Sequence, residues 1–84
     1  MEISEKILII FDYMTYPKGK PANNLLAFDK KEKELWTAEQ PIESATSAYV
    51  NFVEEDPLRV GNFAGFVCQI DTETGKIHDS LFTK

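Results

Sequence analysis

Nucleophilic catalysis would need the one thiol and the one imidazole of the chain, Cys68 and His78. Both lie near the C-terminus, on two segments expected to form one hairpin, where they could face each other. A catalytic nucleophile also requires a base and an orienting group. Cys68 sits between Val67 and Gln69, and a free cysteine in mid-strand is typically a small buried hydrophobe. We therefore expect a structural Cys68 and a surface His78, and a small hydrolase that uses His78 with a carboxylate ranks third among the functional hypotheses.

Metal and phosphate chemistry find little support in the residue pattern. One cysteine and one histidine cannot make a structural zinc site without carboxylate ligands. Asp71 and Glu73 match the first positions of a calcium loop, but the remaining spacing and the terminal glutamate of that loop are missing. Gly61 and Gly65 lack the Lys-Ser/Thr pair and the following helix of a phosphate-binding loop. The sequence therefore predicts no cofactor and no metal ion.

The position of the carboxylates is more informative than their number. The chain holds 14 acidic and 9 basic residues, a formal net charge of −5. Segment 35–58 contains five of the acids and no lysine or arginine, whereas the remaining chain holds nine of each sign. A nucleic-acid-binding protein needs positive charge to neutralise phosphates, so we expect no nucleic-acid partner. An acidic segment suits a basic protein partner, or it serves solubility alone.

The predicted partner-binding residues are the acids of this segment and one aromatic anchor: Glu39, Glu43, Tyr49, Glu54, Glu55 and Asp56. The carboxylates would stand in for the phosphates that a nuclease grips, and they would speed association. The tyrosine would pack against the partner, as amphipathic aromatic side chains do at interfaces. Acid–base catalysis by the triplet 54–56 would need a pocket that raises one carboxyl pKa. A solvated strand end before Pro57 is the alternative explanation of the triplet.

Short strands must position these residues, because no segment shows helical spacing of apolar residues over ten positions. The run Ile7 to Phe11 is apolar on both faces and is expected to be central in a sheet, within a strand from Lys6 to Met14 that alternation prolongs to Tyr16. A loop is expected over Ala38 to Ser47. Further strands are expected at Leu25 to Phe28, Glu34 to Thr37, Ala48 to Glu54, Leu58 to Phe63, Phe66 to Ile70 and Ile77 to Phe82.

Turn chemistry separates these strands. The tip Asp29 to Lys33 lacks glycine, so a residue such as Lys31 or Glu32 must adopt a strained turn conformation. Gly75 supplies a positive φ that closes the last hairpin, and Gly61 is expected to mark a bulge. With 84 residues and 43% hydrophobic content, the chain suits one ordered domain over residues 1–84. The pattern predicts an all-β antiparallel meander of six or seven strands, rolled into a half-barrel or a small sandwich.

The two clearest hairpins resemble each other and a known type. Leu25 to Asp29, returning at Glu34 to Trp36, and Phe66 to Asp71, returning at Gly75 to Ile77, share an apolar strand, an aspartate, a short tip and a return strand. This pattern resembles the hairpins of quinoprotein-type propeller blades. A propeller needs at least four blades, and this chain has room for about two hairpins. The resemblance therefore implies hairpin chemistry alone, with no quinone or metal site.

The whole pattern resembles small uncharacterised bacterial all-β proteins. The shared parts are the apolar first strand, Asn23 to Asp29, Leu35-Trp36, Ile70 to Ile77 and Phe82 to Lys84. Some small acidic proteins of this kind look like immunity proteins, which neutralise a cognate bacterial toxin. With the acidic segment, the resemblance implies a non-enzymatic protein-binding module: an acidic immunity or antitoxin-like inhibitor of a basic toxin, with a nuclease as the expected target. The alternative is a structural or orphan β-domain that forms a homodimer through an edge strand.

The expected compartment is the bacterial cytoplasm. The N-terminus is acidic and has no long apolar stretch, which excludes a signal peptide. The longest apolar run, Ile7 to Phe11, is too short to span a bilayer, so we expect no membrane partner. A single cysteine cannot form an internal disulfide, whereas small secreted domains usually carry several.

Overall fold

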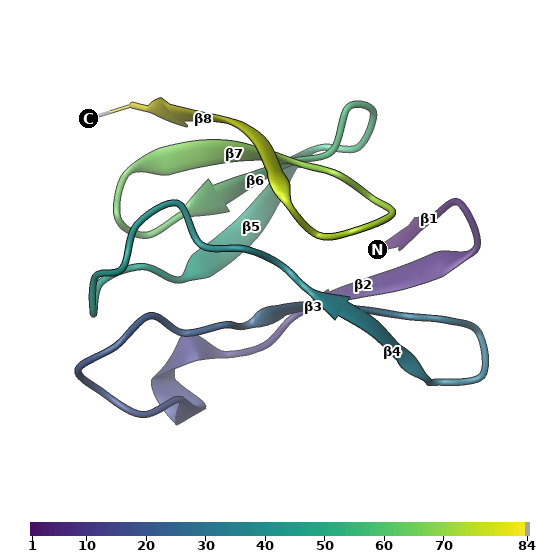
Figure 1. Ribbon diagram of the computed structural model, residues 1–84, viewed down its shortest axis with the longest axis horizontal. Coiled ribbons are helices and arrows are strands. Elements are labelled where there is room, and N and C mark those ends of the chain that lie inside the picture. Colours follow the sequence, from purple (N-terminus) through teal and green to yellow (C-terminus); the bar gives the residue numbers. More distant parts are fainter. Residues whose placement is uncertain (84) are drawn as a thin grey trace.

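The computed structural model describes residues 1–83, and it arranges them as two four-stranded antiparallel sheets (Figure 1). The first sheet has the order β1 (Glu2–Ile3), β2 (Lys6–Ile10), β3 (Leu25–Phe28), β4 (Glu34–Thr37). The second has the order β5 (Tyr49–Glu54), β6 (Arg59–Asn62), β7 (Phe66–Ile70), β8 (Ile77–Phe82). The all-β antiparallel prediction is confirmed, and within each sheet the strands that are adjacent in the sequence are also paired in space. Lys84, which ends the Phe-Thr-Lys run, lies outside the described residues.

The count of eight strands exceeds the predicted six or seven because of β1. Residues Glu2 and Ile3 pair with Ile7 and Lys6 across a turn at Ser4-Glu5. Both turn residues have positive φ, 48° and 67°, yet neither is the glycine or asparagine that normally signals such a turn. The sequence therefore contains no turn residues from which this hairpin could be predicted.

The predicted extension of the first strand to Tyr16 is wrong. The strand ends at Ile10, and a 3-10 helix, η1, spans Tyr13–Thr15. Asp12 starts it, because a carboxylate oxygen of Asp12 accepts a hydrogen bond from the backbone N–H of Met14 at 2.9 Å. Short polar side chains of this kind compete with strand pairing by satisfying a nearby amide locally.

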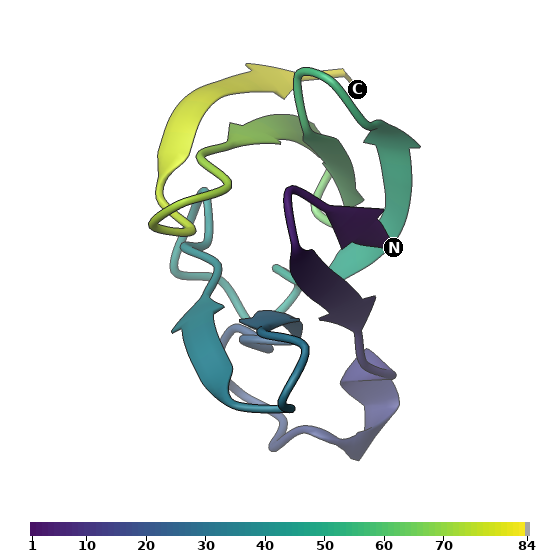
Figure 2. The same cartoon turned by 90° about the vertical axis from the view of Figure 1, so that its right-hand side faces the viewer.

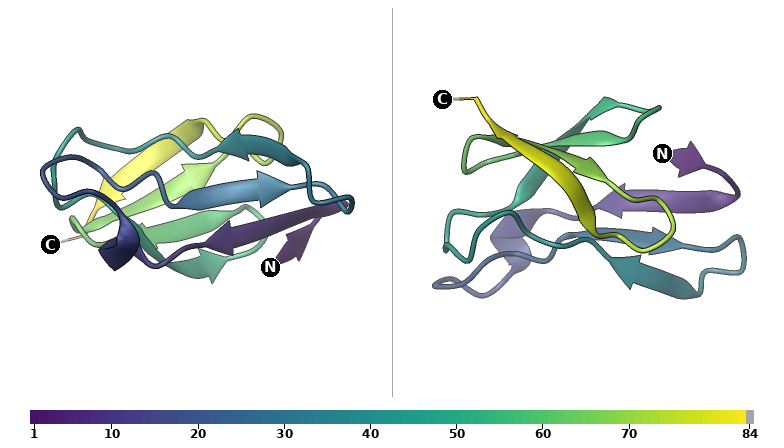
Figure 3. Two further views of the ribbon diagram at one scale, coloured as in Figure 1. Left: turned by 90° about the horizontal axis from the view of Figure 1, so that it is seen from below. Right: turned by 45° about the horizontal axis from the view of Figure 1, so that its top comes forward.

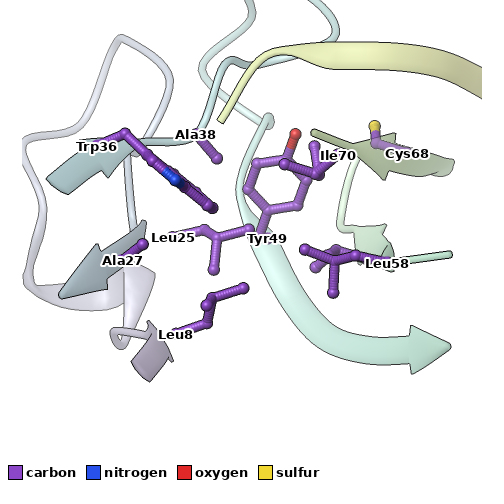
Figure 4. Close-up of a cluster of buried hydrophobic side chains, with 10 residues drawn as sticks. Leu8, Leu25, Ala27, Trp36, Ala38, Tyr49, Leu58, Cys68 and Ile70 are labelled. Carbon is purple, nitrogen blue, oxygen red and sulfur yellow. The ribbon is translucent and has the colours of Figure 1, made fainter. Parts of the chain in front are cut away.

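The hydrophobic core lies between the sheets and takes side chains from both (Figure 4). Leu8, Ala27 and Trp36 are paired across β2, β3 and β4 and are all buried. Val60 and Cys68 face them from β6 and β7, with no exposed surface. Each sheet buries one face, and the two faces share one core, as in a small sandwich.

A buried asparagine joins the two sheets. Asn24 has no exposed surface, and its side-chain Nδ2 donates hydrogen bonds to the carbonyl oxygens of Phe11 and Tyr49, at 2.8 and 2.7 Å. Its Oδ1 accepts from the backbone N–H of Tyr49 at 2.9 Å. The amide therefore acts as a strand neighbour for the start of β5 while it is also bonded to Phe11, which directly follows β2. Such a fully satisfied buried polar group specifies how the sheets meet.

The glycines act where the backbone or a neighbour demands them. Gly75 has a φ of 77°, and a Cβ there would lie 2.5 Å from the Trp36 ring. The glycine of the predicted turn therefore also leaves space for the tryptophan ring. Glu32 takes the strained turn conformation expected at the tip, with a φ of 66°. The bulge expected at Gly61 lies instead on the partner strand β5, where the register shifts between Tyr49 and Asn51. A Cβ at Gly61 would lie 2.5 Å from Oδ1 of Asn51, so a larger residue there would have to displace the exposed Asn51 side chain.

Strand β2 is central in its sheet, as its apolar sequence predicted, but only one of its faces is buried. Leu8 points into the core, whereas Ile9 on the opposite face is 39% exposed. Leu35 on β4 is also exposed. The left view of Figure 3 looks onto the first sheet, with β2, β3 and β4 side by side in front of the second sheet.

Candidate functional site

A hollow of about 460 Å³ opens at one end of the sandwich, where three turns and β1 converge. Its walls come from β1, from the β5–β6 turn and from the β7–β8 turn. Figure 2 looks onto this end of the molecule, with β1 placed between the two sheets. We call this hollow the acidic hollow, because its charged residues other than His78 are Glu2, Glu55, Asp56 and Asp71.

The acidic hollow has an apolar floor. Leu58 and Ile70 are almost fully buried and belong to the core of the second sheet, and Ile3 of β1 packs against that core. The floor is apolar because it is formed by side chains that also belong to the hydrophobic core between the two sheets. Carboxylates above an apolar floor match an amphipathic cation, with its apolar part below and its charge above.

Asp71 is the best-fixed carboxylate of the hollow. Its Oδ1 accepts hydrogen bonds from the backbone N–H of Glu73 at 2.7 Å and of Thr74 at 3.3 Å. Its Oδ2 lies 3.4 Å from Nε2 of His78. The Glu73 amide lowers the pKa of the Asp71 carboxyl, with further lowering by Thr74 and His78, and partial burial opposes them. Asp71 therefore stays anionic, and its predicted role in the turn is confirmed.

The structure divides the predicted acidic residues between two places. Glu55 and Asp56 line the acidic hollow, and Glu54 lies next to them on β5, paired with Arg59. Glu39 and Glu43 instead line another hollow together with Lys20. Figure 1 shows the reason: β5 separates the 38–48 loop, which precedes it, from the β5–β6 turn, which follows it. Segment 35–58 therefore presents two separate acidic regions.

Glu39 is also partly committed to the fold. Its Oε1 accepts a hydrogen bond from the backbone N–H of Ile77 at 3.0 Å, and its own N–H donates to the carbonyl of Gly75 at 2.9 Å. These contacts tie the 38–48 loop to the β7–β8 hairpin. The Glu39 carboxylate satisfies an amide at the start of the edge strand β8.

The prediction that Tyr49 anchors a partner is wrong. The side chain has no exposed surface and lies between Leu25 of one sheet and Ile70 of the other (Figure 4). Its hydroxyl donates a hydrogen bond to the carbonyl of Glu39 at 2.6 Å, and burial raises the pKa of Tyr49, with a further contribution from Cys68. Alternation along a strand does not decide whether the even or the odd residues face the core. Here the hydrogen bonds from Asn24 hold the backbone of Tyr49 so that its ring faces inward.

Sequence reasoning missed one contributor to the acidic hollow, Glu2, assigned Asp71 only to a turn, and placed His78 at the surface without a specific carboxylate partner. Glu2 is separated from Asp71 by almost the whole chain, and no local pattern relates the two. Only the packing of β1 beside the second sheet brings them to one hollow.

The thiol and the imidazole do not form a catalytic pair. Cys68 is fully buried and lies opposite Ser80 in the β7–β8 register, whereas His78 is exposed beside Asp71. Burial raises the pKa of the Cys68 thiol, although Tyr49 lowers it somewhat. The structural role predicted for Cys68 agrees with this position.

Two further observations concern residues 1–83 only. Within them, no group of three or more His, Cys, Asp or Glu side chains is arranged to hold a metal ion. None of the helical structure in this range has the length and apolar character that a membrane-spanning helix needs.

Comparison with known proteins assigns the chain to a family. No curated protein and no solved structure is detectably similar to it. A family described as a domain of unknown function, DUF7957, matches residues 1–82, which is nearly the whole sequence. On this match, the chain belongs to the DUF7957 family.

Proposed function

We propose that this chain is a non-enzymatic protein-binding module, and that it binds a basic partner through the acidic hollow. The observation that carries the proposal is the combination of an apolar floor with four carboxylates around a hollow of about 460 Å³. Hollows of several hundred cubic ångströms commonly hold ligand groups. The net charge of −5 adds a long-range attraction for a basic surface.

An arginine or lysine side chain of the partner fits this arrangement. Its aliphatic stem would lie on Leu58 and Ile70, and its cationic head would reach Glu55, Asp56 or Asp71. A bidentate arginine–carboxylate pair is among the stronger protein hydrogen-bond arrangements. Because Asp71 is held by backbone amides, it is pre-organised to accept such a head group.

The sharper form of the proposal is an immunity-like inhibitor of a basic toxin in the bacterial cytoplasm. A nuclease toxin carries basic side chains that grip phosphates, and Glu55 and Asp56 would occupy those side chains in place of substrate. A free, buried Cys68 suits a reducing compartment. Tyr49 has no part in this mechanism, and Glu39 and Glu43 would contribute charge at a distance.

The test compares two variants of equal net charge. One carries Glu55→Lys and Asp56→Lys in the acidic hollow, and the control carries Glu34→Lys and Glu43→Lys at exposed positions elsewhere. The probe is a capped peptide, Gly-Arg-Leu-Arg-Arg-Gly, titrated by calorimetry at about 0.15 M salt, where distant charges are screened beyond roughly 8 Å. We expect at least about a tenfold loss of affinity in the first variant and at most about a threefold loss in the control.

Equal losses in both variants would mean that net charge alone attracts the peptide, and they would remove the acidic hollow from the proposal. The inhibitor form has its own test, which is co-expression with the protein encoded by the adjacent gene. Protection of the cells by the wild type and its loss in the Glu55→Lys, Asp56→Lys variant are expected. Protection that survives both charge reversals would contradict it.

A second candidate, self-association through an edge strand, is favoured by the exposed end of β8. Leu81 and Phe82 expose more than half of their surface on this edge strand, and the Phe82 ring contacts the Phe66 ring at a tilt of 54°, with centroids 5.1 Å apart. Edge strands with exposed apolar side chains can pair with another chain. A dimer in sedimentation experiments that Leu81→Lys dissociates would support this function, and a monomer at all concentrations would contradict it.

A further inference from the structure

A second hollow, of about 310 Å³, lies at the opposite end of the molecule from the acidic hollow and shares no lining residue with it. It forms where η1 and the loop after it meet the loop before β5 and the β6–β7 turn. Figure 1 shows these loops gathered at the end away from the N-terminus. We call it the aromatic groove, because Tyr13, Tyr16 and Phe63 line it.

The floor of the aromatic groove is made of alanine. Ala22 and Ala48 are buried and form a parallel bridge, with the N–H of Ala22 donating to the carbonyl of Ser47 at 3.0 Å. Because both side chains are single methyl groups, the backbone of these segments lies close to the surface and leaves room above it. The groove is therefore built into the junction between the two sheets.

The walls of the groove are mainly apolar, and two of their side chains are largely exposed. The rings of Tyr13 and Phe63 lie 5.7 Å apart between centroids with an interplanar angle of 34°, which connects η1 to the second sheet. Phe63 is nevertheless 53% exposed, and Met14, which also lines the groove, is 70% exposed. Clustered exposed apolar side chains of this kind mark interaction sites. Methionine, being flexible, adapts to the shape of a bound chain.

The charge of the aromatic groove is opposite to that of the molecule. Its only charged lining residues are Lys18 and Lys20, and neither forms an ion pair within residues 1–83. Lys20 also borders the neighbouring hollow that contains Glu39 and Glu43. In a chain of net charge −5, an apolar groove whose charged lining residues are both lysines favours a ligand with acidic groups.

We propose that the aromatic groove binds an extended, proline-containing peptide segment that is flanked by acidic residues. Extended proline-rich chains dock on grooves lined by aromatic side chains, since they are already ordered and expose flat apolar rings. Phe63 and Met14 remain largely exposed at the groove, so a peptide laid across it can contact both side chains. Lys18 and Lys20 then pair with the acidic flank.

Two capped peptides test the proposal: Pro-Pro-Leu-Pro-Glu-Glu and its matched form Pro-Pro-Leu-Pro-Lys-Lys. Backbone amide shifts in NMR titrations with the full chain report both affinity and place. We expect the acidic peptide to bind with a dissociation constant of about 1 mM or tighter, at least roughly tenfold better than the lysine peptide. The shifted amides should cluster around Phe63 and the 13–20 region.

Variants connect this binding to the groove. Phe63→Ala should lower the affinity for the acidic peptide by at least about tenfold, because it removes an aromatic anchor. Lys18→Glu with Lys20→Glu should remove the preference for the acidic peptide without changing the apolar lining. Ala45→Leu adds bulk at an exposed lining position and should also weaken binding. Leu81→Ala, at an exposed apolar residue outside the groove, is the control and should bind as the wild type does.

Several results would overturn the proposal. These are equal binding of the two peptides, wild-type affinity in both Phe63→Ala and Ala45→Leu, absence of binding at about 5 mM peptide, and binding of a single-stranded DNA oligonucleotide in place of the peptide. The Glu55→Lys, Asp56→Lys variant should bind the acidic peptide at least as well as the wild type. Failure of the acidic hollow would thus leave this test unaffected.

Discussion

A single side chain, Tyr49, shows how a residue suited to an interface becomes part of the core. Its ring contributes to the contact between the two sheets, and its hydroxyl is satisfied by the carbonyl of Glu39. Because the hydroxyl has a partner, burial of the whole side chain is favourable. The same residue type at Tyr13 lies on the surface, in the aromatic groove.

The buried position of Tyr49 predicts how stability responds to mutation and to pH. Tyr49→Ala should lower the free energy of unfolding by about 3–5 kcal/mol, and Tyr49→Phe by only about 1 kcal/mol at neutral pH. The pKa of Tyr49 is raised above its ordinary 10.0 in the folded state. The unfolded chain therefore loses this proton first, so the stability from Tyr49 is complete below pH 10.0 and is lost as pH rises above it.

Urea unfolding at neutral and alkaline pH measures this effect. Tyr49→Phe should lose less stability on alkalinisation than the wild type, whereas the exposed-site control Tyr13→Phe should follow the wild type. Identical alkaline profiles for Tyr49→Phe and the wild type would contradict the assignment.

At the scale of elements, the hairpins depend on contacts that their own sequences only partly contain. The β7–β8 turn closes locally through Asp71 and Gly75. The same turn also receives Trp36 from β4, whose Nε1 donates a hydrogen bond to the carbonyl of Thr72 at 3.0 Å. The turn therefore joins the second sheet to the first, and Gly75 serves both purposes.

Alanine substitutions at two glycines with positive φ distinguish the cost of backbone strain from the cost of a steric clash. Gly75→Ala should destabilise the fold by more than about 2 kcal/mol, because the new Cβ would lie 2.5 Å from the Trp36 ring in addition to the strain of a φ of 77°. Gly19→Ala has a φ of 90° but meets nothing within 4 Å, so it should cost about 1 kcal/mol. Urea midpoints measure both, and equal losses would show that the Trp36 contact is unimportant.

At the scale of the whole molecule, the two sheets depend on each other. Each sheet has one buried face, and both faces contribute to the same cluster of side chains. Neither sheet can bury an apolar face alone, and Asn24 adds hydrogen bonds between them. The molecule should therefore unfold as one unit.

The chain contains one tryptophan and one cysteine, which supply a natural probe for each sheet. Trp36 fluorescence reports on β4, and the reactivity of the buried Cys68 with a thiol reagent reports on β7. We expect both signals to change with the same urea midpoint, and Cys68 to react slowly in the native protein. A fluorescence transition that precedes cysteine exposure would mean that the first sheet unfolds separately.

The hairpins and their turns were predictable from the sequence, because their determinants are local. The strands Leu25 to Phe28, Glu34 to Thr37 and Phe66 to Ile70 have the predicted bounds, and Glu32 has the predicted strain. Turn residues and alternating side chains act within a few positions, so a linear pattern contains the information. The strand β1 was missed for the same reason, since its Ser4-Glu5 turn lacks the usual residues.

Tertiary structure alone decided which face of each strand is covered and which charges meet. Strand alternation is compatible with either direction of the Tyr49 side chain, and the hydrogen bonds from Asn24, which directly precedes β3 of the other sheet, fix its backbone. The acidic hollow combines Glu2 with Asp71, and the aromatic groove combines Tyr13 with Phe63. These residues meet only because a shared core brings distant turns to the same end of the molecule. The physical reason is that burial depends on what packs against a residue, and a local sequence pattern does not contain that partner.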